Sequence, residues 1–259
     1  MLKLDNITMQ FGGVTAVNQA TIDIDKHEII GLIGPNGAGK TTAFNMVTGI
    51  YEPTSGKIFF QPDEGKDPQD ITGMKPEDIA DLGICRTFQN IRLFKQLSVF
   101  ENVCIGGFLR MKTGWLSNVL HLPAYLQERR ALEGEAEELL KSIDLWDEKD
   151  TRSSSLPYGK QRRLEIARAL ATHPKLLLLD EPAAGMNPQE TQELMAFIKE
   201  IQAKFDLTIF LIEHHMDVVM GICDRIYVLD HGQMIASGVP EEIQNNPRVI
   251  EAYLGVEDA

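Results

Sequence analysis

The chain has little of several features that define whole classes of protein. Its 259 residues include 3 cysteines, Cys85, Cys104 and Cys223, which are far apart and form no Cys-x-x-Cys pair. This spacing excludes a disulfide scaffold and argues against a zinc site, so we expect reduced thiols. No apolar run approaches the roughly 20 residues that a membrane-spanning helix needs, and the first ten residues lack the apolar core of a secretory leader. The sequence therefore predicts a protein that reaches a membrane only through partners.

Basic residues are scarce relative to acidic residues. Lys and Arg number 25 against 38 Asp and Glu, which gives a formal net charge of −13. This balance argues against general affinity for nucleic acid or anionic lipid, so no nucleic-acid partner is expected. Any phosphate binding must therefore be local, through a few side chains and backbone dipoles.

Strand and helix patterns divide the chain into three parts. Residues 2–9 and 16–24 partly alternate apolar and polar residues, as half-buried antiparallel strands do, whereas residues 28–33 are more continuously apolar. From about 98 to 149 the pattern is mostly helical, and the last third returns to strands alternating with helices. The sequence predicts an α/β fold with a mostly parallel core sheet, an antiparallel β subdomain and an inserted helical subdomain.

These patterns also predict the domain organisation. We expect a single domain over residues 1–259, in which 1–97 and 172–259 form a β/core lobe and 98–171 form a helical lobe. The stretch at about 110–130 is irregular, and we interpret it as an insertion on the helical lobe or as a longer helix-loop-helix connection.

A glycine-rich segment carries the first chemical signal. Residues 34–41 (GPNGAGKT) match G-x-x-x-x-G-K-[ST] between a predicted strand and a helical pattern at 41–48. Its glycines let the backbone wrap a phosphate, and successive N–H groups with the helix N-terminus offer it partial positive charge. The lysine adds a full charge, and the threonine hydroxyl can ligate Mg²⁺. The predicted nucleotide-binding residues of this P-loop are Gly34, Asn36, Gly37, Ala38, Gly39, Lys40, Thr41 and Thr42.

Two carboxylates support the same chemistry. Asp180 ends the apolar run LLLLD, and in P-loop enzymes such an aspartate holds Mg²⁺. Glu181 follows directly and is well placed to orient or deprotonate an attacking water. Taken with the P-loop, the pair predicts a hydrolase of nucleoside triphosphates.

Further segments resemble the ATP-binding cassette (ABC) ATPases. LPYGK at 156–160 precedes a helical pattern and resembles the family's LSGGQ signature, TFQN at 87–90 resembles its glutamine loop, and EHH at 213–215 resembles its switch-histidine segment. Their order and spacing agree over nearly the whole chain. The resemblance implies an ATPase that uses ATP and Mg²⁺, whose P-loop and signature meet around ATP only when two chains associate head to tail.

The resemblance also implies roles for individual residues. Gln89 is the glutamine of its loop and a metal ligand, His214 is the switch residue that senses or stabilises the γ-phosphate, and Glu181 is catalytic. Phe11 stands where the family places an aromatic for adenine stacking, although a core role is nearly as well supported, and Val17 joins the nucleotide-binding set. The signature residues that would bind the ATP of the other subunit are Pro157, Tyr158, Gly159 and Lys160.

The chain departs from the family pattern at three of these segments. Pro157 replaces the signature serine and has neither hydroxyl nor N–H, so the contact with the partner's ATP must depend on the Gly159 amide and the helix dipole. Asn187 and His215 stand where aspartates are usual. These departures suit a heterodimer with unequal sites, but they leave a homodimer open.

Within the family, DEPAAGMNP at 180–188, IEHHMDVVMGICDRIYVLDHG at 212–232 and AYLG near the end resemble the importers of branched-chain amino acids. The insertion resembles the longer of their two ATPases, the LivG type. The implied partners are two membrane permease subunits, a second ATPase subunit and, indirectly, a periplasmic amino-acid-binding protein, with the chain on the cytoplasmic face of the inner membrane. The alternatives are the lipopolysaccharide-export ATPase, a non-transport ABC ATPase, and a P-loop kinase or GTPase, for which the NKxD motif is missing.

Overall fold

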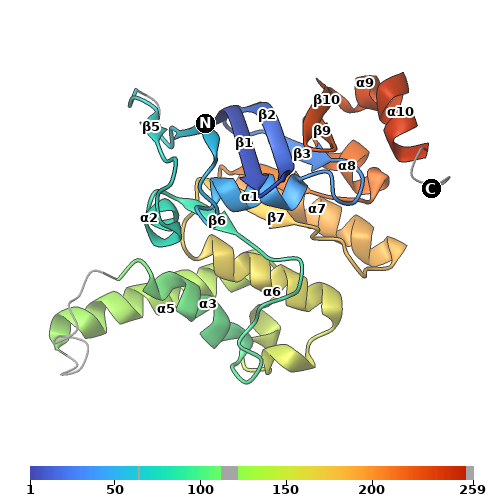
Figure 1. Cartoon of the computed structure of the whole chain (residues 1–259). Coiled ribbons are helices and arrows are strands. Elements are labelled where there is room, and N and C mark those ends of the chain that lie inside the picture. Colours follow the sequence, from blue (N-terminus) through green and yellow to red (C-terminus); the bar gives the residue numbers. More distant parts are fainter. Residues whose placement is uncertain (64, 112–121, 255–259) are drawn as a thin grey trace. The chain divides into compact units, whose positions relative to one another are not determined.

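The computed structural model describes residues 1–63, 65–111 and 122–254, which form two compact units (Figure 1). We call Met1–Gln89 together with Lys175–Ala259 the core unit, and Asn90–Pro174 the helical unit. Most of the predicted insertion at 110–130, residues 112–121, lies outside the described residues. Each unit is described by itself below.

The core unit contains an antiparallel sheet of four strands in the order β2-β1-β4-β5. These strands are β1 (Leu2–Phe11), β2 (Val14–Ile24), β4 (Ser55–Phe60) and β5 (Gln69–Asp70). The alternation seen in the sequence gives β1 and β2 one buried face, with Leu2 paired to Ile24 across the ladder. The short strand β5 was not predicted, because it consists of two exposed residues in a segment rich in Pro and Gly.

The second sheet of the core unit has six strands in the order β10-β9-β3-β8-β7-β6. These strands are β3 (Ile29–Ile33), β6 (Ile84–Arg86), β7 (Leu176–Asp180), β8 (Thr208–Ile212), β9 (Arg225–Asp230) and β10 (Gln233–Gly238). All neighbours are parallel except β10, which forms a hairpin with β9. Because β3, β7 and β8 are buried at every residue, they read as continuous apolar runs. The carboxyl ends of these parallel strands meet at one edge, where the P-loop and Asp180 follow.

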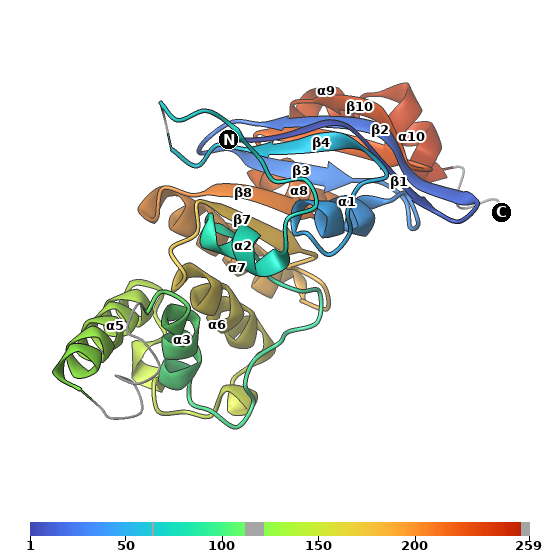
Figure 2. The same ribbon diagram turned by 60° about the vertical axis from the view of Figure 1, so that its left-hand side comes forward.

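Within its described residues, the core unit has six helices. They are α1 (Lys40–Val47), α2 (Pro76–Asp81), α7 (Pro188–Lys204), α8 (Met216–Ile222), α9 (Pro240–Gln244) and α10 (Pro247–Leu254). Helix α1 packs into the core that lies between the two sheets (Figure 2). The rings of Phe44 and Phe210 lie 4.7 Å apart in this core. Gly49 follows the helix with φ +71°, as a left-handed C-terminal glycine does.

The described part of the helical unit contains α3 (Val99–Phe108), α5 (Pro123–Ser142), α6 (Tyr158–Leu170) and two short 3₁₀ turns, η1 (Trp146–Glu148) and η2 (Ser153–Ser155). Helix α3 packs against both α5 and α6 (Figure 1). A Cβ atom at Gly106 would collide with the carbonyl oxygen of Arg168 on α6, so the glycine allows the two helices to approach closely. Among the helices of the described residues, none has the length and apolar character that crossing a membrane requires.

The fold class predicted from the sequence is confirmed: a mostly parallel core sheet, an antiparallel sheet and a separate set of helices. One side chain behaves differently from its neighbours on the helix surface. Arg162 on α6 is fully buried, and its guanidinium forms a 2.7 Å ion pair with the equally buried Glu165.

Candidate nucleotide site

The P-loop joins β3 to α1 and has a backbone that only glycine adopts readily. Gly34, Gly37 and Gly39 have φ values of +148°, +80° and +102°. A Cβ atom at Gly34 would collide with the carbonyl oxygen of Leu229, and one at Gly39 with that of Ala16. The glycines are therefore required both by the turn and by the strands packed directly behind it.

Lys40 is the first residue of α1 and is only 5% exposed. Its ammonium group folds back onto the loop, donating to the carbonyl oxygens of Gly34 at 2.7 Å and Pro35 at 2.9 Å. Burial lowers the pKa of Lys40, and the charges of Glu181 and Asp180 act against this shift. A cation held at the mouth of a glycine loop, next to the first turn of a helix, fits an anionic phosphate group.

Three predicted residues meet at the ends of neighbouring strands. Glu181 follows β7 with φ +47°, a left-handed conformation that is rare for a residue with a side chain. One of its carboxylate oxygens accepts a hydrogen bond of 2.6 Å from Nε2 of Gln89, and the other lies 2.9 Å from Nε2 of His214. Strained backbone that is held by surrounding contacts is typical of functional sites.

Asp180, the last residue of β7, lies beside a residue that the sequence analysis missed. Nη2 of Arg86 donates to its Oδ2 atom at 2.6 Å, and both side chains are 8% exposed. Arg86 is the last residue of β6, three residues before Gln89. Its only sequence signal is a charged residue at the end of a short apolar strand.

Glu213 was also missed, although it directly precedes His214. Its carboxylate is fully buried and accepts hydrogen bonds from the amides of Ala183, His214 and His215 at 2.7, 2.9 and 3.2 Å. One buried carboxylate therefore ties the turn after Glu181 to the segment that carries the histidine. The sequence feature that could have indicated this role is a glutamate that directly follows a buried apolar strand.

The remaining P-loop residues differ in exposure. Ala38 is buried, Gly39 and Thr42 are half-buried, and Asn36, Gly37 and Thr41 are exposed, so the Thr41 hydroxyl is accessible to a ligand. Lys40, Thr41 and Asp180 together fit a phosphate with a bound Mg²⁺, because hydroxyl and carboxylate oxygens are the ligands that Mg²⁺ prefers.

The two residues predicted near the adenine lie on the antiparallel sheet. Phe11 ends β1, is 43% exposed, and packs edge-on against Tyr51 with ring centroids 5.2 Å apart. Val17 in β2 is fully buried, and it packs beneath the loop close to Gly39. Phe11 therefore presents an open ring face, whereas Val17 supports the loop from the core.

The signature residues lie in the helical unit. Pro157 is the N-cap of α6, so the helix begins at Tyr158, which is 41% exposed. The ammonium group of Lys160 forms an ion pair with Glu148. The first turn of α6 thus presents backbone amides and a helix N-terminus, while its lysine already has an acidic neighbour.

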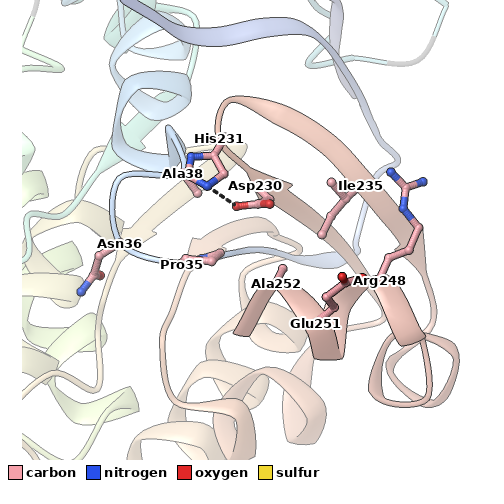
Figure 3. A pocket seen from close by; sticks show the side chains of 9 residues that line it. All are labelled: Pro35, Asn36, Ala38, Asp230, His231, Ile235, Arg248, Glu251 and Ala252. Carbon is pink, nitrogen blue, oxygen red and sulfur yellow. Dashed lines mark ion pairs between the residues drawn. The ribbon is translucent and has the colours of Figure 1, made fainter. Parts of the chain in front are cut away.

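A pocket of about 370 Å³ borders the P-loop on its outer side (Figure 3). It is lined by loop residues 35, 36 and 38, by the β9–β10 hairpin, and by Arg248, Glu251 and Ala252 of α10. Lys40 and Thr41 do not line it. The pocket therefore shares Pro35, Asn36 and Ala38 with the P-loop but does not include its lysine or threonine.

The fold and the site together define a P-loop nucleotide-binding protein of the ABC type. Residues 17–184 match the ABC transporter family, and residues 233–259 match the branched-chain amino acid ATP-binding cassette transporter family. The chain therefore belongs to the ABC transporter family, as an ATP-binding and ATP-hydrolysing subunit of the branched-chain amino acid group.

Individual relatives agree with this assignment. The chain is 46% identical to the high-affinity branched-chain amino acid transport ATP-binding protein LivG of Salmonella typhimurium, over 98% of each chain. It is 42% identical to the corresponding BraF protein of Pseudomonas aeruginosa, again over 98% of each. A crystal structure of an ABC transporter cassette in its ADP conformation is similar with a TM-score of 0.84 and 30% identity, over 98% of each chain.

Proposed function

We propose that this chain is the ATPase that powers import of branched-chain amino acids: leucine, isoleucine and valine. The proposal is supported by the names of its relatives LivG and BraF, which match over 98% of both chains. Since cargo crosses through other subunits, no side chain of this protein needs to touch it. We further propose that the chain acts on the cytoplasmic face of the inner membrane.

The observation that carries the catalytic part is the fixed position of Glu181. Gln89 and His214 each contact one of its oxygens, at 2.6 and 2.9 Å, and a carboxylate oxygen keeps a second lone pair for water. In our proposal Glu181 orients and deprotonates the water that attacks the γ-phosphate. His214 senses or stabilises that phosphate, and Lys40 attracts the β- and γ-phosphates.

The metal part of the proposal concerns three residues. Thr41 and Asp180 would hold Mg²⁺, with Gln89 as a further ligand. When bound, Mg²⁺ neutralises charge that develops on the phosphate oxygens. The exposed hydroxyl of Thr41 and the carboxylate of Asp180 at the strand end support this assignment.

We propose that a second ATPase subunit, either a different chain or a second copy, completes the ATP-binding site. The signature of one subunit would face the P-loop of the other. Because Pro157 offers no donor and Lys160 is paired with Glu148, this contact would depend on the Gly159 amide and the α6 dipole. ATP closes such a dimer only by binding the closed state more tightly than the open one.

We propose that the segment after Gln89 contacts the two permease subunits, through Ile91, Leu93 and Phe94. The side chain of Phe94 is 49% exposed, yet its backbone is fixed. The side chain of the buried Asn102 accepts a hydrogen bond of 3.0 Å from the amide of Phe94 and donates one of 3.2 Å to its carbonyl oxygen. An apolar ring on a rigid backbone suits a groove for a partner helix. The periplasmic amino-acid-binding protein would act indirectly, through the permease.

The two lobes of the chain would have different roles. We propose that residues 1–97 with 172–259 act as the catalytic lobe and residues 98–171 as the lobe that carries the signature. The compact units of the structure, divided at Gln89 and Pro174, are compatible with two such lobes.

Purification of the tagged chain from its own membranes tests this function. We expect two permease subunits and an ATPase to co-purify, and the complex in liposomes with the binding protein to take up leucine when ATP is present. Lys40→Ala should assemble but not transport. Co-purification with lipopolysaccharide-export subunits, or uptake that is independent of ATP, would contradict the proposal.

A further inference from the structure

Arg86 is a buried cation that contacts Asp180, one of the residues of the proposed metal site. Its guanidinium donates to Oδ2 of Asp180 at 2.6 Å and to Oδ1 of Asn45 at 2.7 Å, while Thr48 Oγ1 lies 3.5 Å away. Asn45 lies in α1, the helix that begins with Lys40, and Thr48 directly follows this helix. One planar group therefore joins β6, β7 and α1 behind the phosphate cradle.

The surroundings leave the guanidinium little freedom to move. Its Cζ atom lies 5.6 Å from the ring centroid of Phe44 and 5.8 Å from that of Phe88, the residue before Gln89. Its Nε atom is buried and has no hydrogen-bond partner among the described residues. A buried donor without a partner is costly, so the position of Arg86 is dictated by its other contacts.

The ion pair with Arg86 determines which oxygen of Asp180 is available to a metal. A charge-assisted hydrogen bond to Oδ2 fixes the side chain and leaves Oδ1 as the oxygen for a metal or its water. Without this partner, the Asp180 side chain is free to turn toward Lys40, and that turn removes it from the metal. Partners of metal-ligating carboxylates typically affect metal affinity by about 10- to 100-fold.

We propose that Arg86 is a positioning residue for Asp180, one that makes ATP binding by this chain depend on Mg²⁺. The inference rests on the proposed metal role of Asp180. Arg86 contacts neither ATP nor the metal in this account. It acts only through the orientation of the carboxylate.

Calorimetry with the purified full chain tests this inference. ATP is titrated in MgCl₂ and in EDTA. The dissociation constant in EDTA divided by that in MgCl₂ gives the magnesium effect. We expect Arg86→Gln to reduce this ratio about tenfold or more, while the affinity in EDTA stays within about twofold of wild type. Arg86→Lys should restore part of the ratio, because it returns the charge without the fork.

Two further variants complete the design. In Asp180→Asn the magnesium effect should be lost, and adding Arg86→Gln should lower it no further, since both changes act through one carboxylate. Arg225→Gln removes another arginine ion pair of the core unit, with Glu28, and should leave the ratio unchanged. If Arg86→Gln does not fold, Asn45→Ala, which removes the second anchor of the guanidinium, should lower the ratio by a smaller factor.

The outcomes separate the inference from the proposed function. If wild type shows no magnesium effect, or Asp180→Asn keeps it, the metal role of Asp180 is wrong. If Asp180→Asn loses the effect while Arg86→Gln and Asn45→Ala keep it, only the inference is overturned. Equal losses of affinity in MgCl₂ and EDTA would likewise overturn it, because they indicate a purely structural role.

Discussion

Nε2 of His214 lies 2.9 Å from Oε1 of Glu181, although the two residues are 33 positions apart in the chain. They meet because β7 and β8 are parallel neighbours, so the segments that follow them reach the same edge of the sheet. The contact joins the residue proposed to activate water to the one proposed to sense the γ-phosphate.

Lys40→Ala should weaken ATP binding by at least about tenfold, because it removes the buried cation at the mouth of the P-loop. Equilibrium binding of ATP measures this effect. Lys57→Ala is a matched control, since Lys57 is an exposed lysine of the same unit that pairs with Asp70. Wild-type ATP affinity in Lys40→Ala would refute the assignment of the cradle.

Gly39→Ala should destabilise the protein by about 2 kcal/mol and abolish ATP binding. A side chain at φ +102° is strained, and its Cβ would collide with the carbonyl oxygen of Ala16. Urea unfolding measures the loss. Gly13→Ala serves as the control, because a Cβ there meets nothing within 4 Å. Equal unfolding free energies for the two variants would show that the loop tolerates a side chain.

Glu213→Gln should lower the free energy of unfolding by about 1–3 kcal/mol, because the amide supplies only one acceptor oxygen for the backbone N–H groups of Ala183, His214 and His215. ATP turnover should fall with it, since those groups position the residues beside Glu181. The exposed Glu200→Gln on α7 provides the comparison. Unchanged unfolding and turnover would mean that the buried carboxylate positions nothing.

Two of the three thiols should resist alkylation in the native protein. Burial raises the pKa of Cys104 from 9.0 to about 11 and also raises that of Cys223. Near neutral pH a shift of this size lowers the thiolate fraction of Cys104 about a hundredfold. Mass spectrometry after brief iodoacetamide treatment should find label at Cys85 before the other two, and rapid labelling of Cys223 would contradict its burial.

The local elements were accessible from the sequence. The P-loop, the carboxylates at the end of β7, the buried residues of α7 and the hairpin at 230–232 all depend on short-range patterns, and the structure has each of them. Strand alternation likewise predicted β1 and β2, because one face of each is buried.

Buried polar contacts between distant segments were not accessible in this way. Arg86 and Asp180 are 94 positions apart, and nothing in either local sequence indicates that they pair. Lys160 was presented as a cation for phosphate, and its pairing with Glu148, 12 positions earlier and partly exposed, was likewise not indicated by the local pattern. Burial of a charged side chain depends on which partner the fold brings to it, so such contacts need the tertiary structure.

The bound nucleotide of Glu181→Gln, measured in the assembled transporter after incubation with ATP and Mg²⁺, tests the central claim most directly. We predict that this variant retains intact ATP in a closed ATPase dimer and hydrolyses it at least about a hundredfold more slowly than wild type. Wild type under the same conditions should contain ADP. If Glu181→Gln instead converts its bound ATP to ADP at the wild-type rate, Glu181 is not the residue that activates water.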